Sequence, residues 1–218
     1  MNTNTLPKLS LEAIEQACEA YISQHMAQDS AHDLAHIKRV VVSARQLANA
    51  EGADPFIVVP AAWLHDLVNL PKNHPERHLA SGMAAEQASV FLSELGYADG
   101  ALKAIKHSIT AHSYSAAVVP ETVEAKVVQD ADRLDAIGAI GVARCMMVGG
   151  QLGRELYQTL DPFCEDRRPD DTTFSIDHFY NKLLCLADSF QTQAGKAEAK
   201  RRTAFMETFL DQLRSEIV

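Results

Sequence analysis

Long apolar runs are missing from this sequence. No stretch reaches about 18 apolar residues, the length at which a helix can span a bilayer. The opening residues, MNTNTLPKLS, also lack the basic segment followed by an apolar stretch that marks a secretory signal. We therefore expect no membrane partner, no export signal and a cytoplasmic location.

Cysteine and aromatic residues are also scarce. Four cysteines, at positions 18, 145, 164 and 185, form no Cys-x-x-Cys pair. This spacing predicts free thiols in a reducing compartment and argues against a disulfide framework. Aromatic residues make up only 6% of the chain, whereas Ala, Leu, Glu and Gln are plentiful, which favours helix over sheet.

Positive charge is in deficit, with a net charge of −9. Binding to a nucleic-acid polymer or to an anionic membrane needs a basic surface, so both are excluded as general partners. A small anionic substrate stays compatible with this charge, because a metal ion or a few local cations can dominate one pocket.

Three common catalytic and phosphate-binding motifs are absent. The chain contains no G-x-x-x-x-G-K-[ST], no G-x-G-x-x-G and no G-x-S-x-G sequence. The glycines of MMVGGQLG follow a predicted helix and indicate its end, so they do not form a phosphate-binding loop. Any catalytic chemistry must therefore come from another arrangement of residues.

Apolar residues recur at helical spacing through most of the chain, and no stretch alternates as a half-buried strand would. The spacing predicts helices at about 11–21, 34–48, 56–68, 79–95, 100–112, 122–148, 176–190 and 196–216. Asp54 is expected to cap a helix with Pro55 at its first position, and Gly52 and Gly96 to end helices. The run 56–68 is apolar enough to be a strand, but its length favours a helix that Pro60 kinks or delays.

The predicted fold is therefore all-α. A chain of 218 residues fits one domain with a substantial core. We expect a single domain over 1–218, with a core at about 20–150. Residues 151–218 would form a C-terminal helical extension that serves as a lid or packs on the core, and 161–175 a long polar loop.

The stretch AAWLHDLVNL places an adjacent His65-Asp66 pair among apolar residues. Burying an unpaired charge is so costly that such a group normally pairs or binds a metal. His36 and Asp132 likewise lie in apolar helical segments. Two imidazoles and two carboxylates would make a nitrogen and oxygen site suited to Mn, Fe, Co, Ni or Zn. Taken alone, each of these residues is more often a core histidine or a helix-capping aspartate than a metal ligand.

The ordered set H…HD…D resembles the HD-domain superfamily of metal-dependent phosphohydrolases. Five blocks carry the resemblance, in the same order as in the bacterial YedJ/YpgQ-like branch: HDLAHIKRV, WLHDLVNLPKNHPERHLAS, IKHSITAHSYS, VVQDADRLDAIGAIGVAR and DHFYNKLLCL. They cover roughly residues 20–200, so the resemblance implies an HD-domain helical bundle.

The resemblance also implies the ligands of one divalent metal ion, which would be Mn, Co, Ni, Fe, Zn or Mg. These ligands are His36, His65, Asp66 and Asp132. Within DADRLD the family pattern selects Asp132, and leaves Asp130 and Asp135 to cap or orient their neighbours.

The implied activity is hydrolysis of a phosphoester or phosphoanhydride by a metal-activated water. The substrate would be a small phosphorylated molecule, most often a nucleotide, and the enzyme a nucleoside triphosphate pyrophosphohydrolase or a nucleotidase. Asp66 would orient the water. Several branches carry an acid shortly after the HD pair, whereas this chain has Asn69 and no carboxylate before Glu76. The proton-transfer residue is therefore open: either the metal-bound water oriented by Asp66 needs little help, or His78 or Glu76 reaches in as a catalytic residue.

Five further residues are predicted to contact the substrate: Lys72, Arg77, His112, Arg133 and Lys182. The cations among them are equally compatible with solvated surface residues. His107 and His112 lie five residues apart, so on one helix they point about 140° away from each other. They are not expected to share an ion, which favours a single-metal site with His112 near the substrate.

Two alternatives to a hydrolase stay open. One is a non-catalytic nucleotide-binding regulatory HD module, although degenerate HD domains usually lose ligands and this chain keeps all four. The other is a di-iron oxygenase on the same fold, which the lack of a well-spaced second histidine pair disfavours. The oligomeric state is also open, with a homodimer as one option.

Overall fold

The computed structural model describes residues 7–25, 33–70 and 74–217. Within these residues the fold is helical, with no strand and one isolated bridge between Glu155 and Phe174. The all-α prediction is confirmed. No helix in the described ranges is both long and apolar enough to cross a membrane.

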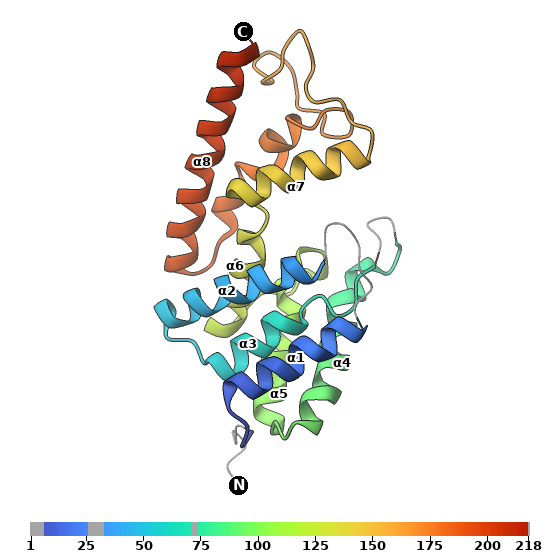
Figure 1. Cartoon of the computed structure of the whole chain (residues 1–218), viewed down its shortest axis with the longest axis vertical. Helices are drawn as coiled ribbons and strands as arrows, with labels where there is room; N and C mark the ends of the chain where they lie inside the picture. The colour runs from blue at the N-terminus through green and yellow to red at the C-terminus, as the bar shows by residue number, and fades with distance from the viewer. Residues whose placement is uncertain (1–6, 26–32, 71–73, 218) are drawn as a thin grey trace. The chain divides into compact units, whose positions relative to one another are not determined.

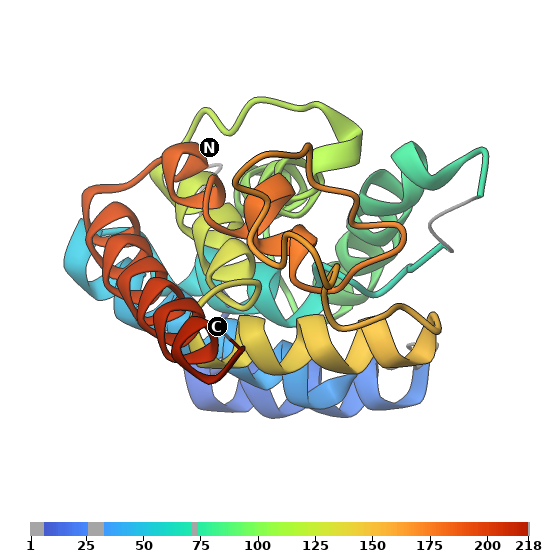
Figure 2. The same ribbon diagram turned by 90° about the horizontal axis from the view of Figure 1, so that it is seen from above.

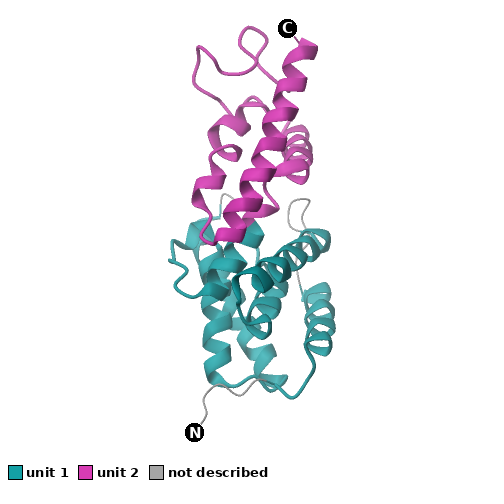
Figure 3. Cartoon of the chain, turned by 90° about the vertical axis from the view of Figure 1, so that its left-hand side faces the viewer, with its two compact units in different colours: residues 1–132 teal, residues 133–218 magenta. Residues whose placement is uncertain are grey.

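The chain divides into two compact units, unit 1 over Met1–Asp132 and unit 2 over Arg133–Val218 (Figure 3). Unit 1 contains α1 (Leu11–His25), α2 (Leu34–Glu51), α3 (Pro55–Leu64), α4 (Ala80–Glu94), α5 (Asp99–His112) and most of α6 (Val123–Leu134), with short 3-10 turns at Arg77–Leu79 and Tyr114–Ala116 (Figure 1). The expectation of one domain with a lid over 151–218 stays a prediction.

Helix α3 forms the centre of unit 1. Residues 57–64 are all buried, and α3 contacts α1, α2 and α5. A helix surrounded on all sides is apolar all round, which explains why this run lacked a clear helical period. Pro60 lies inside the helix and does not delay its start. Pro60 has no N–H for the Phe56 carbonyl, and the Tyr97 hydroxyl donates to that carbonyl instead, at 3.0 Å.

The helix ends predicted at Asp54 and Gly52 are found. The Asp54 side chain accepts a hydrogen bond from Phe56 N, with Pro55 in the first turn of α3. Gly52 ends α2 in the left-handed region, at φ 69°, and its N–H bonds to the Ala48 carbonyl. These ends depend on neighbouring residues only, so the sequence is sufficient to predict them.

The prediction of one helix over 122–148 is wrong. The chain leaves α6 at Leu134 and begins α7 (Gly138–Gln151) after a break, with Gly138 at φ 74°. Side chains of unit 2 stabilise the break: Arg202 donates to the Leu134 carbonyl at 2.6 Å, and Arg144 donates to the carboxylate of Asp135 at 2.7 Å. Gly149 and Gly150 lie within α7, because that helix continues to Gln151.

The prediction of an α-helix over 176–190 is also wrong. The structure has a π-helix at Phe179–Leu183 and a 3-10 helix at Leu186–Ser189. The final helix, α8 (Gln193–Ile217), agrees with the prediction, and it crosses and contacts α7 (Figure 2). The long polar loop over 161–175 is free of helix, as predicted.

Candidate metal centre

The sequence had suggested that the His65-Asp66 pair lies inside a helix. In the structure the pair lies just after the end of α3. Leu64 is the last helical residue, and His65 occupies the C-cap with φ −60° and ψ −37°. The His65 ring turns back on the helix, and its Nδ1 donates to the Ala62 carbonyl at 2.8 Å. A carbonyl oxygen can only accept, so this bond leaves Nε2 with its lone pair exposed to other ligands.

Two other helices bring the remaining candidates to this pair. His36 lies in the first turn of α2, where the capping Asp33 carboxylate accepts a hydrogen bond from His36 N at 2.7 Å. Asp132 lies in the last turn of α6. Each candidate therefore lies at or beside a helix end. The helix restricts the backbone of the residue and leaves its side chain available to bind a ligand.

The four predicted ligands converge in unit 1. His36 Nε2 lies 3.7 Å from Asp66 Oδ2 and 3.5 Å from Asp132 Oδ1. His65 Nε2 lies 3.5 Å from Asp66 Oδ2 and 3.7 Å from Asp132 Oδ1. One ligand atom from each of His36, His65 and Asp66 lies within 4.8 Å of the others. The structure thus brings all four side chains together, and their role as ligands stays a prediction.

This arrangement fits a divalent cation. His65 is completely buried, and its Nε2 makes no hydrogen bond within the described part of the chain. Leaving a buried polar atom without a partner costs about 1–3 kcal/mol. A cation between the imidazole lone pairs and the carboxylates would satisfy both, and the Ala62 carbonyl already holds the His65 ring as metal-binding histidines are usually held.

The neighbouring imidazoles favour the ionised form of both carboxylates. Burial raises the pKa of Asp66, but the nearby imidazoles of His65, His112 and His36 outweigh it and hold that pKa well below its usual range. Burial likewise raises the pKa of Asp132, and His65, His36 and His112 together bring it below its usual value. The cluster therefore offers two negative charges to a cation.

A third imidazole lies against the other oxygen of Asp66. His112 is buried at the end of α5, and its Nε2 is 3.5 Å from Asp66 Oδ1. Its Nδ1 donates to the Ile109 carbonyl at 2.6 Å, and its ring stands edge-on to His65 at 4.7 Å. Burial lowers the pKa of His112, but the contact with Asp66 outweighs this and raises it.

His107 points elsewhere. Its Nε2 accepts a hydrogen bond from Glu121 N at 3.0 Å, and the side chain is half-buried. The two histidines of α5 thus have different partners, as their five-residue spacing suggested. Only His112 approaches the metal cluster, and its contact with substrate stays a prediction.

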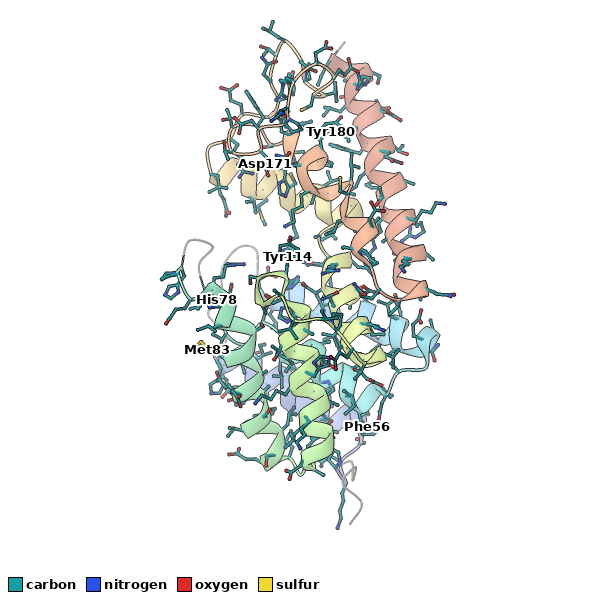
Figure 4. The ribbon with its side chains drawn as sticks, turned by 180° about the vertical axis from the view of Figure 1, so that it is seen from behind. Phe56, His78, Met83, Tyr114, Asp171 and Tyr180 are labelled. Atoms are coloured by element: carbon teal, nitrogen blue, oxygen red, sulfur yellow. The ribbon has the colours of Figure 1, made fainter. Side chains whose placement is uncertain are left out.

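The remaining predicted substrate and proton-transfer residues belong to different parts of the chain. Lys72 lies outside the described residues. Arg77 donates to the Leu70 carbonyl at 2.7 Å, and His78 is exposed (Figure 4). Among the described residues, neither Arg77 nor His78 has a hydrogen bond or ion pair with the four clustered side chains. Arg133 and Lys182 belong to unit 2.

Within unit 2, Arg133 donates to the Ser189 carbonyl, and Lys182 is an exposed residue of the π-helix. Unit 2 also contains a pair that the sequence analysis missed, in which His178 Nδ1 lies 2.6 Å from Asp171 Oδ2. The sequence could have pointed to His178, because this histidine stands four residues before the predicted substrate residue Lys182 in the block DHFYNKLLCL.

Comparison with known proteins places the chain. The HD domain family model matches residues 33–137, a range that includes all four clustered residues. YpgQ of Bacillus subtilis, an uncharacterized protein, is 36% identical over 194 residues, which cover 87% of this chain and 86% of YpgQ. The chain belongs to the HD-domain family.

Solved HD-domain structures agree with this assignment. The crystal structure of Bacillus subtilis YpgQ in complex with ADP aligns with a TM-score of 0.74 at 32% identity, over 96% of this chain and 97% of that one. An HD-superfamily hydrolase from Bacillus thuringiensis aligns with a TM-score of 0.75 at 34% identity, over 95% and 98%. The predicted HD-domain resemblance and helical fold are confirmed, and the chain has the fold of an HD-superfamily hydrolase.

Proposed function

We propose that this HD-domain protein is a metal-dependent phosphohydrolase that cleaves a phosphoanhydride or phosphoester bond of a nucleotide. The observation that carries the proposal is the buried His65 Nε2, which lies against two ionised carboxylates and has no hydrogen-bond partner in the described residues. His36, His65, Asp66 and Asp132 would hold the ion. A divalent ion at this site would supply Lewis acidity, which activates water and neutralises phosphoryl charge.

The chain's own residues would position that chemistry. The Ala62 carbonyl fixes the ring of His65, and the Ile109 carbonyl fixes the ring of His112. Asp66 is held from both sides, because His36 and His65 face its Oδ2 and His112 faces its Oδ1. A carboxylate restricted in this way loses little entropy when it orients an attacking water, and this pre-organisation is a major source of rate acceleration.

The choice of a nucleotide is supported by a relative. Bacillus subtilis YpgQ was crystallised with ADP, and it resembles this chain along nearly its whole length. We extend nucleotide binding from that protein to this one. The reaction would be either release of pyrophosphate from a nucleoside triphosphate or release of orthophosphate by a nucleotidase, and the products distinguish the two.

A turnover assay with product analysis tests the proposal. The full chain is incubated with Mn²⁺ and a panel of nucleoside mono-, di- and triphosphates, and the nucleotides, pyrophosphate and orthophosphate are separated. We expect at least one nucleotide to be hydrolysed, with hydrolysis abolished by EDTA. Binding of nucleotides without turnover of any of them would contradict the proposal and indicate a regulatory module instead.

A further inference from the structure

A second polar cluster lies entirely within unit 2. His178, immediately before the π-helix, bonds through Nδ1 to the Asp171 carboxylate at 2.6 Å. The other oxygen of Asp171 accepts from Asn181 Nδ2 at 2.8 Å. Because a carboxylate with a depressed pKa only accepts, His178 donates from Nδ1, and Nε2 is the ring atom available to a ligand. The side chain is 25% exposed, so a ligand can reach it.

Two cations border this cluster without ion-pair partners in the described part of the chain. The Nε of Arg154 is buried and has no hydrogen-bond acceptor there. Lys182 is exposed one residue after Asn181. Both lie close to His178: burial lowers the pKa of His178, Asp171 opposes this, and the charges of Lys182 and Arg154 lower it further. A guanidinium with a buried, unsatisfied N–H requires an acceptor, and an anion would supply one.

The backbone holds these side chains in a built framework. Arg154 comes shortly after the end of α7, directly after Gly153, which adopts φ 68°. The backbone N–H of Arg154 donates to the Gly149 carbonyl at 2.9 Å. The next residue, Glu155, is bonded to the long loop: its N–H donates to the Thr173 carbonyl at 3.0 Å. The loop that supplies Asp171 is therefore joined to the segment that supplies Arg154.

The π-helix is a second unusual feature at the same place. Its bond from Leu184 N to the Phe179 carbonyl, at 3.0 Å, spans five residues. π-helical turns are rare in proteins, and many of those that exist lie at functional sites. Here the turn begins directly after His178 and contains both Asn181 and Lys182, so two residues of the cluster lie in the π-helix and a third directly precedes it.

We propose that Arg154 and Lys182 form a phosphate-binding site in unit 2 beside His178, with Asp171 and Asn181 as positioning residues. Because its proton is on Nδ1, His178 would accept a hydrogen bond through Nε2 from a protonated phosphate oxygen. The ligand would be an inorganic phosphate or pyrophosphate, or the phosphate groups of a nucleotide. Arginine suits a phosphate because its planar fork can donate two parallel hydrogen bonds, and lysine adds charge. The proposal goes beyond the metal-dependent reaction, because the site requires no metal.

Calorimetric titration of the full chain in EDTA tests this site. The probes are inorganic pyrophosphate, ADP and adenosine. Pyrophosphate is expected to bind, and adenosine to give no heat. ADP binding as tightly as pyrophosphate would identify nucleotide phosphates as ligands of the site, and weaker ADP binding would identify the free anion. A wild-type chain that binds neither pyrophosphate nor ADP overturns the proposal.

Matched variants locate the binding. Arg154→Gln and Lys182→Gln should each raise the Kd for pyrophosphate roughly tenfold, the usual effect of losing one charge-assisted hydrogen bond. Lys200→Gln, at an exposed lysine of α8, should leave the Kd unchanged. Equal Kd values for the wild type and both site variants overturn the proposal, as does an equal loss in Lys200→Gln, which would indicate general ionic attraction.

Two measurements distinguish a loss of pyrophosphate binding from misfolding and from a loss of nucleotide hydrolysis. Circular dichroism of each variant reports its helix content, and Lys182 is exposed, so its replacement should not disturb packing. A chain that hydrolyses nucleotides with Mn²⁺ but fails to bind pyrophosphate and ADP in EDTA would overturn the phosphate site alone. A chain that binds pyrophosphate through Arg154 and Lys182 without hydrolysing any nucleotide would contradict only the proposed hydrolase function.

Discussion

His65 Nε2 lies 3.5 Å from Asp66 Oδ2, although the two residues are adjacent and would diverge on a regular helix. The end of α3 makes this approach possible, because His65 is the C-cap and Asp66 follows it in a turn. The helix thus supplies a rigid base for the pair, and its termination lets both side chains face one point.

Replacing His65 should remove the metal. His65→Ala deletes the buried imidazole, and we expect metal affinity and nucleotide turnover to fall at least about 100-fold, since even outer-shell changes cost 10–100-fold. Metal content per chain after dialysis, measured by plasma mass spectrometry, checks the result. His107→Ala is the matched control: it removes an imidazole of α5 that bonds to Glu121 N, and it should keep its metal. Equal metal content in both variants would contradict the assignment of His65.

Asp66→Asn should separate charge from shape. The variant keeps the side-chain volume but loses one of the two negative charges that we assign to the cation. Thermal unfolding with EDTA and with Mn²⁺ measures the effect. The wild type should gain about 2.7 kcal/mol at a free metal concentration near 100 times its Kd. Asp66→Asn should gain far less while unfolding cooperatively in EDTA, and an undiminished gain would exclude Asp66 as a ligand.

Local signals explain which parts of the fold could be predicted. Asp54 and Gly52 act through hydrogen bonds to residues two to four positions away, so the sequence is sufficient to place both helix ends. The end of α3 was missed because Leu67 and Val68 continue the apolar run beyond the HD pair. The break before Gly138 was missed because its stabilising contact comes from Arg202, far along the chain.

The candidate sites show the same division. His36, His65, Asp66 and Asp132 could be found because their order resembles a family pattern, although their three helices are distant in sequence. His178 could be found in the block DHFYNKLLCL, but its pairing with Asp171 could not, since a seven-residue separation through an irregular loop has no periodic signature. Sequence reasoning selected Lys182 from that segment by its charge and overlooked the histidine four residues earlier.

His112→Ala should separate substrate binding from metal binding. His112 faces Asp66 Oδ1, whereas His36 and His65 face Oδ2. We expect the variant to retain its metal and to lose about tenfold or more in kcat/KM, the usual effect of removing one charge-assisted contact. Steady-state kinetics beside metal analysis checks this. Loss of the metal would show that His112 is a ligand, contrary to the single-metal site predicted here.

Acid should weaken unit 2 through Glu198. Hydrogen bonds from Arg201 and Arg202, opposed by burial, lower the pKa of Glu198 to about 2. Because the folded-state pKa lies below the unfolded value of about 4.3, the stabilisation is complete above about pH 5 and is lost as the pH falls towards 2.

Urea unfolding of the wild type and Glu198→Gln at pH 6 and pH 3 measures this contribution. The carboxylate is partly solvated, so we expect a difference of only about 1 kcal/mol at pH 6, and about half of it or less at pH 3. Both arginines keep their charge over this range, so the change reports the carboxylate. A difference that is the same at both pH values would contradict the lowered pKa.

Two neighbouring glycines of α7 provide the sharpest packing test. A Cβ on Gly149 would lie 2.1 Å from Ser175 Oγ, whereas a Cβ on Gly150 would meet nothing within 4 Å. Gly149→Ala must displace Ser175, whose carbonyl also accepts from Cys145 Sγ at 3.4 Å, and should destabilise the protein by about 1–3 kcal/mol. Gly150→Ala should be neutral, or stabilising by up to about 1 kcal/mol, because alanine favours helix over glycine. Chemical denaturation of both variants decides the point: equal stabilities would mean that Ser175 does not pack against Gly149 in solution.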